Sequence, residues 1–337
     1  MRTIRFGIIG SGGIVRLWLN GVAQVTDMEV VCIAARNPVT AQEVAKTYGI
    51  NEVTTDFEAM LCRDDIDAVY IGTPHPLHYE HTMMALNHGK HVLCEKPMAM
   101  NVAEERKMFA KAKEKGLLLM EATWMRFFPA MQALRDEVSS GSIGRLRNIH
   151  ATFSYNIQGV DRTHRTLNPE LGGGGLLDVG VYCLHFCQAI LGENPLEITG
   201  FASINTTEEA YGVDEQANII ARYPGDVLAS LSCAVLTDMG ESATLYGTKG
   251  KIHLPVFWKP TNYVLSNEEG SKTVSLPVEQ INLEKADVGY QYEIKHFNDC
   301  LRNGMLESPE MTHQRSLEIM MQCDALRKQW QLRYPME

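Results

Sequence analysis

The amino-terminal part of the chain contains the stretch Gly7-Ile8-Ile9-Gly10-Ser11-Gly12-Gly13-Ile14-Val15. The apolar residues 4–9 predict a buried strand, and the glycines after it predict a tight turn that opens a helix. In that setting Gly10 permits the turn, and Gly12 lets the backbone approach a pyrophosphate at the helix N-terminus. Val15 occupies the third position of the fingerprint, where Gly or Ala is usual, so the motif is imperfect. The stretch predicts a dinucleotide-binding turn with contacts from Gly10, Gly12, Gly13 and Ile14.

The second predicted strand, residues 30–34, decides between the two nicotinamide dinucleotides. An NAD enzyme normally offers Asp or Glu at the end of this strand, where the acid binds the ribose 2′-hydroxyl. This chain continues with Ala35-Arg36-Asn37 and has no acid there. A guanidinium can pair with a 2′-phosphate, so Arg36 favours NADP, with NAD possible. The alternative is that Arg36 is simply an exposed arginine at a strand end.

The chain as a whole falls into two halves of different pattern. In the first half, short apolar runs alternate with helical stretches, as in a doubly wound parallel sheet. In the second half, period-two segments separated by Gly, Pro and Asn predict a largely antiparallel sheet in an α+β domain. We therefore predict an NAD(P)-binding domain over residues 1–121 and a substrate-binding and oligomerisation domain over residues 122–337. The predicted strands are residues 4–9, 30–34, 68–71, 92–94, 117–120, 146–155, 217–223, 227–235 and 242–246, and the predicted helices include 101–115, 128–139, 176–191, 289–302 and 312–332.

Composition restricts the partners of this protein. Its 337 residues, of which 45% are hydrophobic, exceed the size at which a single core usually stops growing. The net charge of -10 and the lack of Lys/Arg runs argue against nucleic acid and favour a small-molecule partner. No stretch reaches the roughly 20 apolar residues of a spanning helix and no signal segment precedes the first strand, so we expect a cytoplasmic protein without a membrane partner. The eight cysteines include no C-x-x-C pair, which indicates reduced thiols, and no metal is predicted.

The loop after the strand at residues 92–94 contains Glu95-Lys96-Pro97. Asn101 and Glu104 predict the N-terminus of the next helix, so Lys96 lies in a strand-to-helix loop. Such loops line the ligand crevice of an open α/β sheet, and a lysine there can hold an alcohol or carbonyl oxygen. Taken alone, Lys96 could also be a surface lysine beside a turn proline. Lys96 is the first catalytic candidate.

A second loop follows residues 68–71 and reads Gly72-Thr73-Pro74-His75-Pro76-Leu77-His78-Tyr79-Glu80-His81. Its position after a central strand predicts that it lies beside the nicotinamide. Three histidines at three-residue spacing suggest a metal, but no carboxylate or thiol is fixed with them and His75 precedes a proline in extended chain. We predict instead that His75 or His78 contacts the cofactor or substrate, and that His81 lies on the following helix.

Taken together, four motifs resemble the Gfo/Idh/MocA oxidoreductase family across the whole chain. They are the G-x-G loop, Thr73-Pro74, Glu95-Lys96-Pro97 and Gly172-Gly173-Gly174-Gly175-Leu176-Leu177-Asp178-Val179-Gly180. The stretches at residues 120–129 and 178–183 are similar to the branch of dimeric dihydrodiol dehydrogenases and NADP-dependent D-xylose dehydrogenases. The resemblance implies a Rossmann domain followed by a domain with a large, open, mostly antiparallel sheet, which commonly supports a homodimer or a higher homo-oligomer. It also implies reversible hydride transfer between NAD(P) and a secondary alcohol of a sugar or cyclic diol.

The last motif supplies the predicted acid/base pair. Many relatives carry a histidine as general acid/base after the aspartate, and Tyr182 takes that place here. A phenol has a reference pKa near ~10, so a phenolate base near neutrality needs a neighbouring cation, for which Lys96 is the candidate. Asp178 and Tyr182 share one face of a helix, and the glycines ahead of them permit close approach of a ligand. We predict that Lys96 binds the reacting oxygen, Tyr182 exchanges its proton, and Asp178 orients the pair; the alternative is a helix-terminal acid and a buried structural tyrosine.

Several other residues are predicted to line the site. Trp124, Arg126 and Phe127 start the second domain, and the arginine is expected near a cofactor phosphate or carboxamide. Interdomain packing is the alternative for all three. The predicted cofactor contacts are completed by Thr73, Pro74, His78, Glu95, Lys96, Trp124 and Arg126, and the predicted substrate contacts are His75, Phe127 and His164.

Two other functions stay open at this point. One is a non-catalytic sensor that binds the dinucleotide through the same fold, against which the presence of Lys96, Asp178 and Tyr182 argues. The other is a dehydrogenase of the same family for an inositol, an amino sugar or a biliverdin-like substrate.

Overall fold

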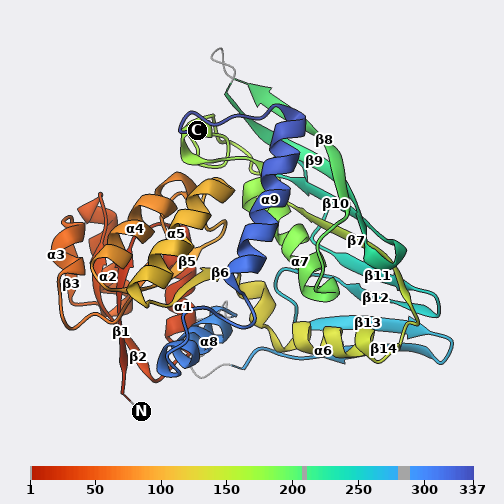
Figure 1. Cartoon of the computed structure of the whole chain (residues 1–337), viewed down its shortest axis with the longest axis horizontal. Coiled ribbons are helices and arrows are strands. Elements are labelled where there is room, and N and C mark those ends of the chain that lie inside the picture. The colour runs from red at the N-terminus through yellow and green to blue at the C-terminus, as the bar shows by residue number, and fades with distance from the viewer. Residues whose placement is uncertain (1, 207–210, 280–288) are drawn as a thin grey trace. The chain divides into compact units, whose positions relative to one another are not determined.

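The computed structural model describes residues 2–206, 211–279 and 289–337 (Figure 1). It divides into two compact units, which are Met1–Trp124 with Val278–Leu317, and Met125–Pro277 with Glu318–Glu337. The sequence predicts a boundary between residues 121 and 122, with residues 122–337 in one domain. In the structure the chain returns to the first unit for Val278–Leu317.

The first unit contains a six-stranded sheet in the order β3-β2-β1-β4-β5-β6, and every neighbouring pair is parallel. The strand order reverses between β1 and β4, which is the topological switch point of a doubly wound sheet. This confirms the predicted Rossmann sheet. The strand β3 was not predicted, because none of its three residues is buried, Glu52 is exposed, and the strand carries no apolar period. The strands are β1 Ile4–Ile9, β2 Met28–Ala34, β3 Glu52–Thr54, β4 Ala68–Ile71, β5 His91–Glu95 and β6 Leu119–Ala122.

Four helices of the first unit pack in two pairs. Helix α4 lies against α5, and α1 lies against α8. A Cβ at Gly21 of α1 would lie 2.5 Å from the Tyr290 Cβ of α8, so this approach requires glycine. The predicted cap of α5 is confirmed, because the Asn101 side chain accepts a hydrogen bond from the Glu104 backbone at 3.0 Å. The helices are α1 Gly13–Val22, α2 Pro38–Tyr48, α3 Phe57–Leu61, α4 His78–Asn87, α5 Val102–Lys115 and α8 Tyr290–Arg302.

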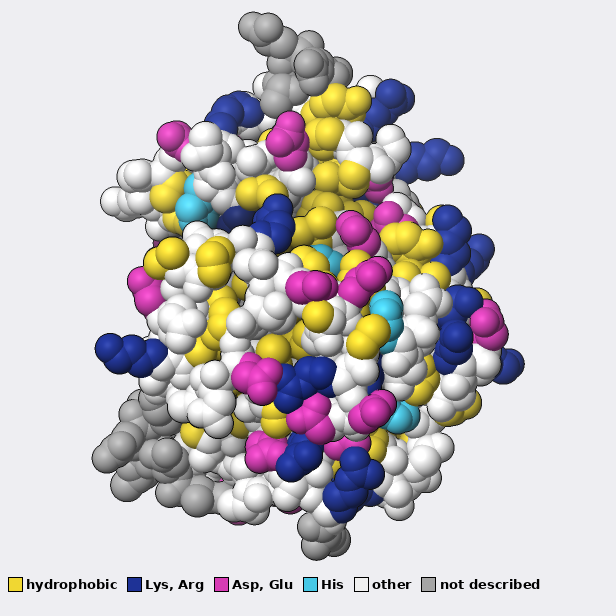
Figure 2. Space-filling model, turned by 90° about the vertical axis from the view of Figure 1, so that its left-hand side faces the viewer, with side chains coloured by type: hydrophobic (Ala, Val, Ile, Leu, Met, Phe, Trp, Pro, Cys, Tyr) yellow, Lys and Arg dark blue, Asp and Glu magenta, His cyan; other side chains and the backbone are white. Residues whose placement is uncertain are grey.

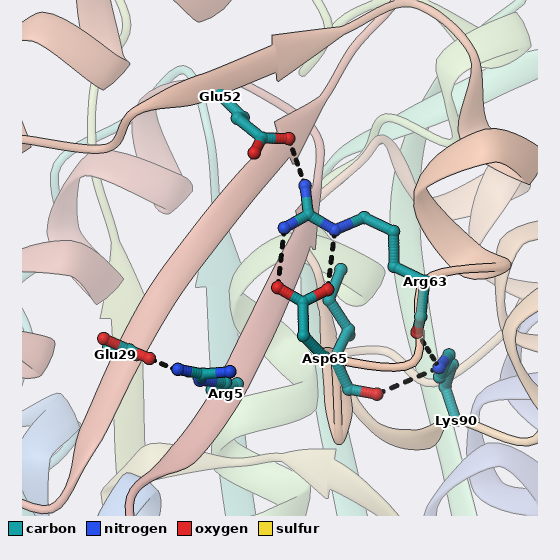
Figure 3. Close-up of polar contacts among 7 residues, drawn as sticks. Arg5, Glu29, Glu52, Arg63, Asp65 and Lys90 are labelled. Atoms are coloured by element: carbon teal, nitrogen blue, oxygen red, sulfur yellow. Dashed lines mark hydrogen bonds and ion pairs between the residues drawn. The ribbon is translucent and has the colours of Figure 1, made fainter.

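A polar cluster fixes the amino-terminal ends of these strands (Figure 3). Arg63 forms a two-pronged ion pair with Asp65 at 2.8 and 2.7 Å and a further ion pair with Glu52 of the edge strand β3. The ammonium of Lys90 is buried and donates to the backbone carbonyls of Arg63 at 2.6 Å and Ile66 at 2.9 Å. Because cofactors bind at the carboxyl ends of parallel strands, this cluster is structural.

The surface carries both signs of charge. On the face drawn in Figure 2, acidic and basic side chains are interspersed, with no broad basic area. The chain has 41 acidic against 31 basic residues, so a polyanion finds little electrostatic attraction here. This pattern fits a protein whose ligands are small molecules.

The second unit contains an eight-stranded sheet in the order β14-β13-β12-β11-β7-β10-β9-β8. Only the β7–β10 pair is parallel, so the sheet is mostly antiparallel, as predicted. Helix α7 packs on β7 and β10. The elements are α6 Pro129–Ser139, β7 Leu146–Ser154, α7 Val181–Leu191, β8 Glu197–Thr206, β9 Gly212–Tyr223, β10 Val227–Ala234, β11 Ala243–Gly247, β12 Gly250–Leu254, β13 Asn262–Asn267, β14 Gly270–Ser275 and α9 His313–Trp330, the last of which begins in the first unit.

The two faces of this sheet differ. Along β9, Ala217, Ile219 and Ala221 are buried, whereas Asn218 and Ile220 between them are exposed. The predicted helix over residues 176–191 is present, but it starts with a π-helical turn, Leu176–Gly180, before α7. Within the described residues, Pro169–Leu191 is the one segment long and apolar enough to span a membrane, and most of it is buried inside the protein, as in a core helix.

Candidate active site

The dinucleotide loop lies where the carboxyl ends of β1 and β4 meet. Gly10 has a φ of 120°, and a Cβ there would lie 2.6 Å from the Gly72 carbonyl oxygen. The Gly72 backbone in turn donates to the Ile9 carbonyl at 3.0 Å. Because the chain reverses its strand order at this point, the crevice between these two loops is the expected ligand position.

The first turn of α1 is open above the loop. A Cβ at Gly12 or at Gly13 would meet nothing within 4 Å, so the space is not filled by the protein. Gly12 is the N-cap of α1 and offers no side-chain cap to the helix. The backbone N–H groups at this helix end are therefore available to a pyrophosphate. Ser11 joins the loop to α2 through a hydrogen bond of 2.9 Å between its hydroxyl and that of Thr40, a contact that the sequence did not reveal.

Arg36 lies exposed between β2 and α2. Among the residues that the structure describes, its guanidinium makes no hydrogen bond or ion pair. The neighbouring Asn37 is used as the cap of α2, where its side chain accepts from the Val39 backbone at 3.0 Å. Arg36 is thus the polar side chain in this loop that is open to a ligand.

Two histidines of the second loop hold the backbone around the predicted site. The buried ring of His78 lies between two carbonyls, with Nε2 2.8 Å from Thr73 O and Nδ1 2.8 Å from Pro97 O. It therefore ties the Thr73–Pro74 loop to the turn after Lys96. Burial lowers its pKa to about 4, which outweighs the opposite effect of the two carbonyls. His81 Nδ1 lies 3.1 Å from the Thr73 hydroxyl, and His75 packs edge-on against His78.

Glu95 and Lys96 lie at the carboxyl end of β5. The Tyr70 hydroxyl donates to Glu95 Oε1 at 2.7 Å, and the Lys96 backbone donates to Oε2 at 3.3 Å. Burial raises the pKa of Glu95 to about 7, against the lowering effect of Tyr70 and Lys96. Lys96 is only 9% exposed, so it is not the surface lysine of the alternative interpretation. The peptide bond to Pro97 is cis.

The turn that follows is held by a residue to which the sequence interpretation gave no role. Glu121 of β6 accepts from the Met98 backbone at 3.1 Å and from the Ser316 hydroxyl at 2.5 Å. Trp124 stacks on Tyr290 of α8, with ring centroids 4.1 Å apart. Both contacts join segments that are far apart in sequence, and they stabilise the side of the unit that carries Lys96.

In the second unit, Arg126 is buried and donates to the side-chain oxygen of Gln188 at 2.5 Å. Gln188 donates in turn to Glu318 at 3.1 Å. Phe127 is half-buried. Arg126 therefore has an internal partner on α7, and its predicted role as a cofactor contact remains a prediction.

Asp178 lies in the π-helical turn, and the side chains of Arg165 and Tyr155 donate to it. Arg165 directs Nη1 to Oδ1 at 3.3 Å and Nη2 to Oδ2 at 3.4 Å. The Tyr155 hydroxyl also donates to Oδ2. Burial, followed by the charge of Asp178, raises the pKa of Tyr155, so this phenol remains a donor. Tyr155 was not identified from the sequence, where it only appeared as the end of a period-two strand.

Tyr182 is buried one turn beyond Asp178. Its ring packs edge-on against Phe153, at 5.2 Å between centroids, and Phe153 stacks on Trp258. The charge of Asp178 raises the pKa of Arg165 most strongly, and Tyr182 adds to the same effect. Asp178 and Tyr182 therefore lie in consecutive helical segments of the second unit, and Arg165 and Tyr155 contact Asp178. The catalytic roles of Asp178 and Tyr182 remain predictions. His164, on the same loop, accepts the Thr166 backbone N–H at 3.3 Å.

The glycine run before Asp178 serves packing, which corrects the interpretation that its missing side chains leave room for a ligand. A Cβ at Gly173 would lie 2.5 Å from the Thr166 carbonyl, and one at Gly174, where φ is 115°, would lie 2.3 Å from Asp214 Oδ1. Asp214 accepts from the Leu176 backbone at 2.5 Å, and the Tyr334 hydroxyl donates to the Gly173 carbonyl at 2.6 Å. The run is therefore fixed against β9 and the C-terminal segment.

Comparison with known proteins agrees with these features. Residues 4–123 match the model for "Oxidoreductase family, NAD-binding Rossmann fold", and residues 131–253 match the model for "GFO/IDH/MocA C-terminal domain". The trans-1,2-dihydrobenzene-1,2-diol dehydrogenase of Bos taurus is 36% identical over 91% of this chain and 90% of its own. That of Xenopus laevis is 35% identical over 98% and 99%.

Solved structures share the fold. A 3-ketoreductase from Actinomadura kijaniata in complex with NADP and TDP-benzene superposes with a TM-score of 0.83 and 27% identity, over 97% of this chain and 98% of its own. The aldose-aldose oxidoreductase from Caulobacter crescentus has a TM-score of 0.86 and 23% identity, over 97% of both chains.

This chain shares an NAD(P)-binding Rossmann unit and a second unit built on a large, mostly antiparallel sheet with these oxidoreductases. This chain belongs to the GFO/IDH/MocA oxidoreductase family. It is an oxidoreductase of the CH–OH group of a sugar or diol.

Proposed function

We propose that the protein is an NADP-dependent dehydrogenase for a secondary alcohol of a cyclic diol or sugar, such as a trans-dihydrodiol or D-xylose. The observation that carries this proposal is the similarity to trans-1,2-dihydrobenzene-1,2-diol dehydrogenases over almost the whole chain, together with the presence of Lys96, Asp178 and Tyr182. D-xylose rests on the resemblance of motifs alone. A substrate panel that also contains inositols and amino sugars separates these cases.

The proposed chemistry divides between cofactor and protein. The nicotinamide accepts or supplies the hydride. During oxidation Tyr182 takes the hydroxyl proton, and during reduction it returns that proton to the carbonyl oxygen. Lys96 donates a hydrogen bond to the reacting oxygen and stabilises the negative charge that develops there. Asp178 accepts hydrogen bonds that fix the orientation of its surroundings, and Thr73, Pro74, His75, His78, Glu95, Trp124, Arg126, Phe127 and His164 are the proposed lining of the cofactor and substrate sites.

The preference for NADP rests on Arg36. It is exposed, it has no carboxylate partner among the described residues, and no acid accompanies it at the end of β2. A guanidinium in this position can bind a 2′-phosphate through two charge-assisted hydrogen bonds. An acid that would bind the 2′-hydroxyl of NAD is absent from the sequence of this loop.

Fluorescence titration with NADPH and NADH tests this preference. Wild-type protein is expected to bind NADPH more tightly, and Arg36→Gln to lose about tenfold to a hundredfold in NADPH affinity with little change for NADH. Arg106→Gln is the matched control, since Arg106 is an exposed arginine on α5. A wild-type preference for NADH would overturn the assignment of Arg36.

We also propose that the open face of the large sheet forms a homodimer or larger homo-oligomer, and that the protein works in the cytoplasm. Phe201 is 88% exposed in the edge strand β8, and Ile220, Leu228 and Tyr246 are exposed on the same face. Large exposed apolar side chains that share one face are typical of a protein interface. Light scattering after size-exclusion chromatography tests it, because Phe201→Asp should shift the protein to a monomer, whereas a monomeric wild type would contradict it.

A further inference from the structure

The negative charge of Asp178 affects the ionisation of Tyr182, which lies one turn further along the helix. An ionised carboxylate beside a phenol disfavours the phenolate, because the two negative charges repel. Taken alone, Asp178 would therefore make Tyr182 a poorer proton acceptor. The structure offers a cation in the same unit that offsets this charge, and it is Arg165, 13 residues before Asp178.

We propose that Arg165 is a positioning residue for Tyr182, whose guanidinium neutralises Asp178 and keeps the phenolate form of Tyr182 accessible. The inference rests on the proposed role of Tyr182 as proton acceptor. It adds a second cation to Lys96 and assigns Tyr155 the role of the donor that fixes the Asp178 carboxylate from its other side.

The geometry supports a fixed guanidinium. Both terminal nitrogens of Arg165 lie opposite the two oxygens of Asp178, at 3.3 and 3.4 Å, which is the fork arrangement that arginine and carboxylate adopt. The hydroxyl of Tyr155, the residue after β7, donates a hydrogen bond to Asp178 Oδ2. Two donors from different segments therefore hold one carboxylate, and the carboxylate holds the arginine in turn.

The two tyrosines differ in what they can do. Tyr155 is half-buried and donates to a carboxylate, and both its partial burial and the charge of Asp178 raise its pKa, which keeps it protonated. Tyr182 interacts electrostatically with Arg165, and opposite charge favours the phenolate. The titratable groups that the described residues place around this turn include Tyr155, Arg165, Asp178 and Tyr182. Asp214 of β9 accepts from the Leu176 backbone, and the Cys233 thiol of β10 lies against Gly180. The side chain of Arg165 is 53% exposed, so solvent screens its charge and the effect on Tyr182 is expected to be about one pH unit.

Titration of the Tyr182 phenol tests the proposal without relying on turnover. Protein labelled at tyrosine Cζ with carbon-13 is titrated by NMR, and Tyr182→Phe identifies the Tyr182 signal. Arg165→Gln should raise the pKa of Tyr182 by about one pH unit. Arg165→Lys keeps the charge and should return the pKa most of the way to its wild-type value. Tyr155→Phe should raise it by less, since the guanidinium stays.

Arg162→Gln is the matched control, because Arg162 is an exposed arginine on the same loop, three residues earlier. The proposal would be overturned if the pKa of Tyr182 were the same in Arg165→Gln and Arg162→Gln. It would also be overturned if Arg165→Lys and Arg165→Gln gave the same pKa. The pH profile of kcat/KM should shift in parallel with the NMR titration. If the NMR shift occurs and no substrate turns over, the proposed function fails while the role of Arg165 stands.

Discussion

The Tyr70 hydroxyl donates a hydrogen bond of 2.7 Å to Glu95 Oε1, between the neighbouring strands β4 and β5. Tyr70 is fixed in turn by stacking on Trp18 of α1, with ring centroids 4.1 Å apart. Glu95 immediately precedes Lys96 and accepts its backbone N–H. Glu95, which precedes the proposed catalytic Lys96, is therefore fixed by a buried tyrosine of the neighbouring strand.

Tyr70→Phe should destabilise the first unit and disturb the Lys96 loop. The variant leaves a buried carboxyl oxygen without its donor, at a cost of about 1 to 3 kcal/mol in the free energy of unfolding. Without this donor the pKa of Glu95, already raised to about 7 by burial, should rise further. Thermal unfolding measures the cost. Tyr48→Phe, whose half-buried hydroxyl donates to the Arg16 carbonyl, is the control and should cost less; equal costs would contradict the special position of Glu95.

Substitution of the two buried lysines described in the first unit, Lys90 and Lys96, should have different effects on stability and on kcat. Lys90 donates to two backbone carbonyls at the amino-terminal ends of the strands, so Lys90→Met should lower the free energy of unfolding by about 2 kcal/mol and leave kcat nearly unchanged. Lys96→Met should reduce kcat by about a hundredfold or more, with a smaller effect on stability. Steady-state kinetics beside thermal unfolding separates the two. Wild-type turnover in Lys96→Met would remove this lysine from the mechanism.

Substitutions at two glycines of the dinucleotide loop should affect different properties, cofactor binding in one case and stability in the other. Gly12→Ala adds a methyl group where nothing lies within 4 Å, so it should fold normally and weaken NADPH binding about tenfold by blocking the approach of the pyrophosphate. Gly10→Ala places a Cβ 2.6 Å from the Gly72 carbonyl at a positive φ and should destabilise the unit itself. Unchanged NADPH affinity in a folded Gly12→Ala variant would place the cofactor elsewhere.

Asp214 should make stability depend on pH. Burial raises its pKa to about 7, from an ordinary value near ~3.9 in an unfolded chain. Between these values the folded state binds a proton that the unfolded state has released, so the contribution to stability is present at low pH and is lost as pH rises toward 7. Asp214→Asn cannot titrate. The melting temperature of this variant, minus that of wild type, should therefore increase as pH rises from about 4 to about 7.

His81 provides the opposite sign as an internal control. Burial lowers its pKa from 6.5 to about 4, so the unfolded state binds the extra proton and stability rises with pH across that window. His81→Gln should remove this rise.

For Asp214, the contradicting result is a difference in melting temperature between Asp214→Asn and wild type that stays constant with pH. Asp214 would then keep one protonation state throughout.

The sequence predicts the first unit well because its signals are local. The bounds of β1 and β4 agree with the apolar runs, and Asn101 caps its helix through a residue three positions away. Neighbouring residues are sufficient for these elements. The same holds for Asp178 and Tyr182, which lie on one helical segment.

Contacts between distant residues could not be predicted in this way. Tyr155 meets Asp178 across 23 residues, and Ser316 meets Glu121 across 195, and neither partner carries a local signal. The glycine run was misinterpreted for the same reason, because the oxygen that fills its space comes from Asp214 on β9. Only the fold brings that carboxyl to the turn.

The most direct test of the proposed mechanism is the turnover of Tyr182→Phe beside wild type, with NADP and a panel of trans-dihydrodiols and sugars including D-xylose. The wild type should form NADPH with at least one of these substrates. Tyr182→Phe should bind NADPH with unchanged affinity and lose about a hundredfold or more in kcat, because the proton acceptor is absent. Turnover of Tyr182→Phe at the wild-type rate would contradict the account.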